Sequence, residues 1–271
     1  ADAGAGGGMT ALRNVTWFVV KDIVRSRWSL VNTLFFAAAT AGLFYLQADA
    51  GKAAVSLSSL CLVFVPLISL LYPAMYYYSA REFVELILTQ PVGRRAVYLG
   101  LFAGIFASLW LGFALGIGVP YLVLGGVNAA GMTALAAVLL VGTALGAIFT
   151  GLALVAAVRF DDRGKGLAVV LGIWLTAAIG YDGAVLAAAT AFAAYPLETP
   201  LLAAALGNPV DLARVLLLIH SDMAALMGYT GAVFMRFFDR ASGLGLAAAV
   251  LTLWAAAPVW YGIRRFARKD F

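Results

Sequence analysis

Long apolar stretches, each bounded by charged, glycine or proline residues, dominate the pattern of hydrophobic and polar positions along the chain. They lie near residues 30 to 47, 54 to 78, 96 to 124, 132 to 158, 166 to 194 and 243 to 263. Each is long enough to cross about 30 Å of hydrocarbon as a helix. The pattern predicts an all-α polytopic membrane protein with six transmembrane helices. The third and fifth stretches exceed one crossing, so we expect them to tilt or break.

The six stretches are expected to form one domain over residues 9 to 271. Residues 1 to 8 are small and glycine-rich, which is typical of a flexible linker, so they are left out of the predicted fold. The sizeable non-spanning segment covers about residues 195 to 242, with breaks at Pro196, Pro200 and Pro209. Apolar residues 215 to 219 and 231 to 234 predict short helices at the outer interface or on the bundle.

Residues 9 to 29 mix charge with an apolar stripe. Leu12, Val15, Val19 and Ile23 share one helical face, and tryptophans accompany them at positions 17 and 28. This pattern predicts an amphipathic N-terminal helix at the level of the lipid headgroups. A plain extension of the first span into the cytoplasm is the alternative.

Charge gives the orientation. Hydrophobic residues make up 64% of the chain and charged residues 11%, whereas soluble domains have roughly 50% and 25%. Fourteen of the 18 Lys and Arg residues fall on one side of the predicted membrane and four on the other. By the positive-inside rule both termini are cytoplasmic. The net charge of +5 therefore indicates contact with anionic membrane lipid and not with nucleic acid.

Other chemistry is limited by what the sequence lacks. The single cysteine, Cys61, allows no internal disulfide, and one histidine leaves little room for proton-transfer catalysis. Lys52 and Lys165 are followed by Ala and Gly, so neither ends a phosphate-binding Gly-x4-Gly-Lys-Ser/Thr loop. We expect neither an enzyme nor a cofactor site in this chain, and energy would come from another polypeptide.

The loop after the second span has the most distinctive sequence. Residues 79 to 100 read Ser-Ala-Arg-Glu-Phe-Val-Glu-Leu-Ile-Leu-Thr-Gln-Pro-Val-Gly-Arg-Arg-Ala-Val-Tyr-Leu-Gly, which predicts a short helix over about 80 to 89 and a turn at 91 to 93. An acidic, Leu-rich helix followed by Gln-Pro-x-x-Arg resembles the permeases of type 2 ABC exporters. Phe83-Val84 stands where that family usually has Gly-Thr.

The resemblance implies a coupling helix that docks on a separate cytoplasmic ATPase subunit, which carries ATP and Mg and is expected in two copies. A second copy of the permease would complete the pathway. The residues implied at or near the ATPase contact are Arg81, Glu82, Glu85, Leu86, Gln90, Pro91 and Arg94.

A second resemblance concerns residues 207 to 218, Gly-Asn-Pro-Val-Asp-Leu-Ala-Arg-Val-Leu-Leu-Leu, and the Gly-Tyr-Thr-Gly-Ala-Val-Phe run that starts at residue 228. Both are similar to permease subunits of the transporters that help to mature the copper-sulfur centre of nitrous oxide reductase. The resemblance implies a bacterial inner membrane location and a periplasmic accessory protein that contacts the external segment, including Asn208, Asp211 and Arg214. Asp211 and Arg214 are also spaced to pair on one helix.

Two polar features of this region leave alternatives open. His220, Met223 and Met227 share a helical face and form a ligand set suited to Cu(I). An ordinary surface histidine with methionine packing is the simpler interpretation, and no metal site is assigned. Asp182 either faces a cavity or partner inside the membrane or marks the outer end of the fifth span.

Small residues recur four apart at Gly100 and Gly104, at Gly112 and Gly116, and at positions 142 and 146. Such pairs allow close helix contact, and packing within one bundle is favoured over a dimer seam.

Three functions fit the sequence. The first is an ABC permease for nitrous oxide reductase maturation. The second is an ABC exporter of a lipid, peptide or drug-like substrate, and the third is a membrane anchor that transports nothing.

Overall fold

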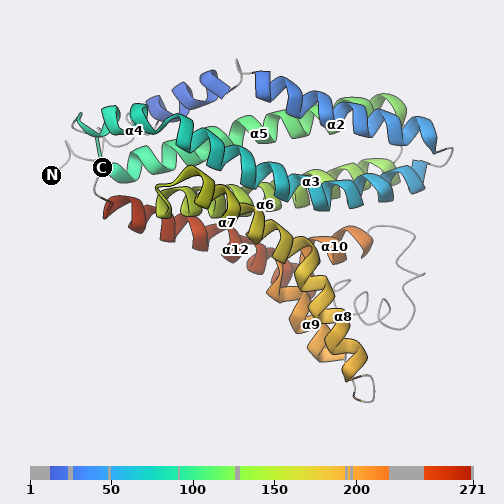
Figure 1. The fold of residues 1–271 in the computed structure, drawn as a ribbon. Coiled ribbons are helices and arrows are strands. Elements are labelled where there is room, and N and C mark those ends of the chain that lie inside the picture. The colour runs from blue at the N-terminus through green and yellow to red at the C-terminus, as the bar shows by residue number, and fades with distance from the viewer. Residues whose placement is uncertain are drawn as a thin grey trace.

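In the computed structural model, every regular element of the described residues is helical (Figure 1). The structure describes residues 13–23, 27–47, 50–90, 92–125, 129–192, 195, 198–219 and 241–269. An N-terminal helix covers residues 13–23. The helices that follow are α2 (Arg27–Leu46), α3 (Ala50–Ser79), α4 (Arg81–Leu88), α5 (Arg94–Leu124), α6 (Ala129–Arg159), α7 (Arg163–Leu175), the π-helical turn η1 (Thr176–Gly180), α8 (Tyr181–Ala191), α9 (Glu198–Gly207), α10 (Pro209–Ile219) and α12 (Ala241–Ala267).

The predicted fold class is confirmed. Within the described part of the chain, six helices are long and apolar enough to cross a membrane, and their positions match the six predicted stretches. The fifth crossing is interrupted, since α7 and α8 are joined through η1. Helices α9 and α10 are bent by 113° at their junction, so they form a broken pair and not a straight span.

The transmembrane helices satisfy their own backbone, as a hydrocarbon environment requires. Polar side chains within them bond back to the preceding turn. The hydroxyl of Thr40 donates to the carbonyl of Phe36 at 2.8 Å, and that of Ser108 donates to the carbonyl of Gly104 at 2.8 Å. Apolar spans therefore carry hydroxyl groups without leaving them unpaired.

Glycines on α5 receive the first two helices of the chain. A methyl group at Gly116 would lie 2.7 Å from the backbone oxygen of Thr33 on α2, and one at Gly104 would lie 2.6 Å from the Cβ of Val19. The N-terminal helix and α2 thus pack end to end along α5. For these α5 glycines the prediction of packing within one bundle is confirmed.

The N-terminal stripe predicted from the sequence is confirmed in its described members, because Val15, Val19 and Ile23 are all buried. They are buried against the protein and not in lipid. Trp17 and Phe18 remain 60% and 48% exposed and are left to meet the headgroups. Leu12 lies outside the described residues.

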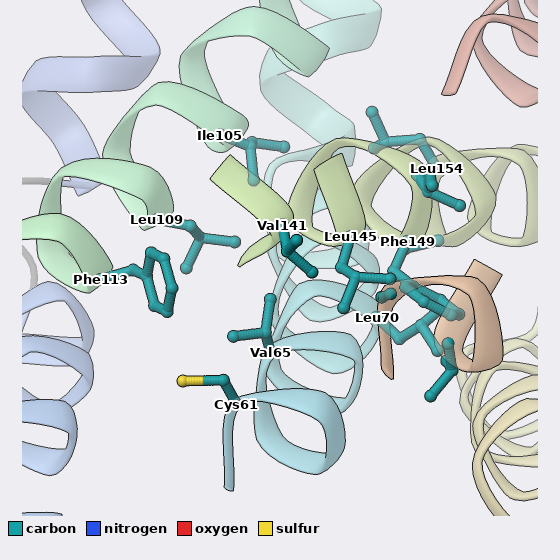
Figure 2. Close-up of a cluster of buried hydrophobic side chains, with 14 of the residues drawn as sticks. Cys61, Val65, Leu70, Ile105, Leu109, Phe113, Val141, Leu145, Phe149 and Leu154 are labelled. Carbon is teal, nitrogen blue, oxygen red and sulfur yellow. The ribbon is translucent and has the colours of Figure 1, made fainter. Parts of the chain in front are cut away.

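The core forms where α3, α5 and α6 meet. Figure 2 shows side chains of all three helices converging, among them Val65, Leu109, Phe113 and Val141. Helix α12 covers the far side of α6, where Gly151 lies against Pro258.

The two ends of the bundle differ. At one end lie α4, the start of α5 and the end of α12, and Arg94 joins the last two by bonding to the backbone oxygen of Ala267 at 3.2 Å (Figure 1). At the other end, α8 and α9 lie side by side and project from the bundle, with the Tyr181 hydroxyl on the Ala204 carbonyl at 2.8 Å. These are called the α4 end and the α8 end below.

Candidate functional site

Helix α4 is the short helix predicted over residues 80 to 89. It follows α3 through a single turn residue, Ala80, whose N–H donates to the Tyr76 carbonyl at 2.8 Å and whose carbonyl accepts from Val84 at 2.9 Å. At its other end the Thr89 hydroxyl donates to the carbonyl of Leu86 at 2.7 Å. Because only one residue separates the two helices, a displacement of α4 acts directly on α3.

One face of α4 is fixed to the protein. Val84 is 1% exposed, and Ile87 and Leu88 pack against the core. The ring of Phe83 stacks on Phe18 of the N-terminal helix, with centroids 4.5 Å apart. The residue that departs from the family pattern therefore provides a contact with the first helix of the chain.

Charged groups tie α4 to the loop between α6 and α7. Arg81 pairs with Glu85 at 2.9 Å and with Asp161 at 3.4 Å. Asp161 also pairs with Lys269 at 2.7 Å, and the same ammonium donates to the Val158 carbonyl at 2.9 Å. The hydrogen bond and charge of Lys269 hold the pKa of Asp161 below its ordinary value, so this carboxylate is ionised at neutral pH.

Two further bonds close the α4 end. The hydroxyl of Tyr78 on α3 donates to the carbonyl of Phe160 at 2.8 Å. The guanidinium of Arg94 donates to the carbonyl of Lys269 at 2.7 Å, in addition to its bond to Ala267. Together with the Asp161 pairs, these bonds hold α3, α4, α5, the 160–162 loop and the chain end as one cluster, called the α4-end cluster below.

The outer face of α4 is open. Leu86 is 63% exposed, and Glu82 and Gln90 are exposed beside it. A large apolar side chain exposed next to charged groups is typical of a protein contact surface.

The structure therefore divides the seven residues predicted for the ATPase contact. Glu82, Leu86 and Gln90 are exposed, whereas Arg81, Glu85 and Arg94 make internal bonds. Pro91 lies outside the described residues.

The second polar site lies at the α8 end. Arg214 of α10 grips the carboxylate of Asp182 on α8 with two bonds, Nη2 to Oδ2 at 2.8 Å and Nη1 to Oδ1 at 2.9 Å. The predicted pair with Asp211 is confirmed, with Nη1 to Oδ1 at 2.9 Å. Two carboxylates and one guanidinium give this triad a net charge of −1. The bidentate geometry fixes orientation as well as charge.

Asn208 joins the break between α9 and α10 to the π-helical turn. Its Nδ2 donates to the carbonyl of Ala177 inside η1 at 2.7 Å, and its Oδ1 accepts from the backbone N–H of Val210 at 3.0 Å. A π-helical turn displaces carbonyls from the regular ladder, and Asn208 supplies a donor to one of them. The triad and Asn208 therefore hold α10 on the interrupted fifth crossing.

Several of these relationships were not visible in the sequence. Asp182 and Arg214 are separate predictions that the structure unites, and opposite charges in two apolar helices are a signal for such pairing. Asp161, Lys269 and Phe18 were not predicted as site residues. His220, Met223 and Met227 lie outside the described residues.

These features define a polytopic α-helical membrane protein that carries a short amphipathic helix on the loop between its second and third crossings. No protein-family model matches the chain. It is similar to two curated proteins named probable ABC transporter permease protein NosY. The protein of Stutzerimonas stutzeri is 29% identical over 93% of this chain and 90% of its own length. That of Pseudomonas aeruginosa is 28% identical over 92% of this chain and 94% of its own length. The resemblance found in the sequence is thus confirmed along nearly the whole chain.

Proposed function

We propose that this chain is the permease subunit of an ABC transporter and that α4 is its coupling helix, docking on a separate cytoplasmic ATPase. The observation that carries the proposal is the two-sided character of α4. Its inner face is bonded into the α4-end cluster, whereas Leu86 and Glu82 face outward. A lever that receives force from a partner needs both a free face and a rigid attachment.

The α4-end cluster supplies the path for that force. Movement of α4 reaches α3 through Ala80, the N-terminal helix through Phe83, and the 160–162 loop through Arg81 and Asp161. Helices that belong to three parts of the bundle are therefore displaced together. An ATPase that changes shape on binding and hydrolysing ATP with Mg would bias the bundle between two packed arrangements.

The proposal places the α4 end in the cytoplasm and the α8 end outside. The α4 end carries Arg81, Arg94, Arg159, Arg163 and the cations of the α12 end, in agreement with the positive-inside rule. A bacterial inner membrane, two ATPase subunits and a second copy of this chain follow from the same family plan. Surrounding lipid meets the exposed apolar faces of the spans.

The particular system we propose is the one that matures the copper-sulfur centre of nitrous oxide reductase. Support comes from the relatives named NosY and from the external segment, where α9 and α10 are held on the fifth crossing. In this proposal a periplasmic accessory protein contacts the segment that includes Asn208 and Asp211. Force that enters at α4 leaves through the fifth crossing and α10.

Variants at Leu86 test the docking. After gentle detergent extraction, we expect the parent protein and Leu86→Met to retain a bound ATPase. Leu86→Glu should lose it, because a carboxylate would replace the exposed apolar contact. Detergent melting curves of the three should coincide, since Leu86 is 63% exposed. Retention of the ATPase by Leu86→Glu would overturn the assignment of α4.

A further inference from the structure

The bundle is built from two closely packed helix pairs, α2 with α5 and α3 with α6. In the first pair, Gly112 and Gly116 let α2 approach α5 closely. The seam between the two pairs is less tightly filled. A cleft of about 310 Å³, part of it open to the side of the bundle, lies in this seam.

The wall of the cleft is apolar and comes from all four helices. Phe36, Val65, Ile68 and Phe113 form much of it, and Figure 2 shows Val65 and Phe113 facing the same space from opposite helices. Trp110 is 42% exposed and stands at the rim, its indole nitrogen bonded to Thr143 at 2.8 Å. The volume lies at the lower limit for ligand sites, so an occupant must be small or slender.

Glycine creates part of this space. A methyl group at Gly146 of α6 would lie 3.6 Å from a ring carbon of Phe106 and 3.7 Å from the hydroxyl of Ser69, both ordinary contact distances. Alanine is therefore accommodated at position 146. A leucine there would extend into the cleft and fill it.

One polar atom on the wall has no partner within the described part of the chain. Asn32 is 8% exposed, and its Nδ2 donates to the Leu109 carbonyl at 3.4 Å. That bond sets the orientation of the amide and leaves Oδ1, the acceptor, without a donor. An unsatisfied buried acceptor costs about 1–3 kcal/mol, and hydrocarbon offers no donor.

We propose that this cleft binds a slender alkyl molecule that ends in a hydroxyl group, with the hydroxyl donating to Oδ1 of Asn32. The alkyl chain would lie along Phe36, Val65 and Phe113 and past Gly146. The opening beside Trp110 gives access from the side of the bundle, where membrane lipid is found. The proposal does not depend on the ATPase or on the α4 end.

The probe for this site is octanol with a diazirine at its third carbon, applied to the full-length protein in detergent and activated by light. We expect mass spectrometry to place the label on residues of the cleft, such as Ser69 and Phe106. Octanol should compete at least about fivefold better than 1-methoxyheptane, an ether of equal size that lacks the donor.

Variants separate the shape of the cleft from its hydrogen bond. Gly146→Leu should lose labelling, with Gly118→Leu as control because Gly118 has no neighbour within 4 Å of its added carbon. Asn32→Leu should keep labelling and make the alcohol and the ether equal competitors. If Gly146→Leu fails to fold, Gly146→Ala should weaken labelling with an unchanged melting curve. Label spread evenly over exposed apolar faces, or equal competition by both compounds in the parent, would overturn the proposal.

Discussion

The carboxylate of Asp161 accepts a 2.7 Å hydrogen bond from the ammonium of Lys269, 108 residues further along the chain. This pair fastens the end of α12 to the loop between α6 and α7, and Arg81 brings α4 to the same carboxylate. The polar contacts of the α4 end thus meet at one exposed residue.

Asp161→Asn should loosen the chain end without unfolding the protein. Exposed pairs contribute at most about 1 kcal/mol, and the Asp161 side chain is 67% exposed. We predict a melting temperature close to the parent value, with faster backbone hydrogen exchange at residues 268 and 269. Unchanged exchange there would show that the pair does not hold the segment.

The same pair predicts a pH dependence. The pKa of Asp161 lies below its ordinary 3.8, so the pair stabilises the folded state above that value and is lost as pH falls through the lower folded pKa. The difference between parent and Asp161→Asn should therefore stay constant from neutral pH down to about pH 5 and vanish in stronger acid. Hydrogen exchange measured over that range checks this, and a difference that disappears near pH 6 would contradict it.

Gly104 tests the seating of the N-terminal helix on α5. Gly104→Ala places a methyl group 2.6 Å from the Cβ of Val19, and overpacking of this kind costs about 1–3 kcal/mol. We predict a lower melting temperature and faster tryptic cleavage after Lys21.

Gly118→Ala is the matched control on the same helix, because nothing lies within 4 Å of its added carbon. It should be neutral, or stabilising by up to about 1 kcal/mol through helix propensity. Equal behaviour of the two variants would mean that the helix does not pack where the structure places it.

Arg214 is predicted to be worth more than Asp182. Arg214→Met leaves the carboxylates of Asp182 and Asp211 facing each other, whereas Asp182→Asn leaves Arg214 paired with Asp211. We expect Arg214→Met to destabilise by about 1–3 kcal/mol, given the partial exposure of the triad. Asp182→Asn should cost clearly less in detergent unfolding followed by tryptophan fluorescence. A larger loss from Asp182→Asn would contradict the bonding described.

Asn208 should control the π-helical turn through its two bonds. Asn208→Ala loses both, which we expect to cost about 1–3 kcal/mol. Asn208→Asp keeps an acceptor for Val210 but turns a carboxylate toward the Ala177 carbonyl. Hydrogen exchange over residues 176 to 180 should accelerate in both variants. Acceleration confined to α10 would indicate that the turn is held by other contacts.

The spans and α4 were predictable because hydropathy and amphipathic spacing are local properties of the sequence. The break in the fifth crossing was expected only from its length, and its form as a π-helical turn held by Asn208 was not. Pairings such as Asp182 with Arg214 and Asp161 with Lys269 depend on how distant helices pack. The sequence showed the charges and left their partners undetermined.

The central claim is that α4 docks on an ATPase through Leu86, and site-specific photocrosslinking tests it most directly. Benzoylphenylalanine would replace Leu86 in cells that hold the whole system, with Leu140 as control because it is 72% exposed on α6, away from the α4 end. We predict a light-dependent adduct of this chain with an ATPase subunit from position 86 and none from position 140. An intact complex that gives no ATPase adduct from position 86 would contradict the account.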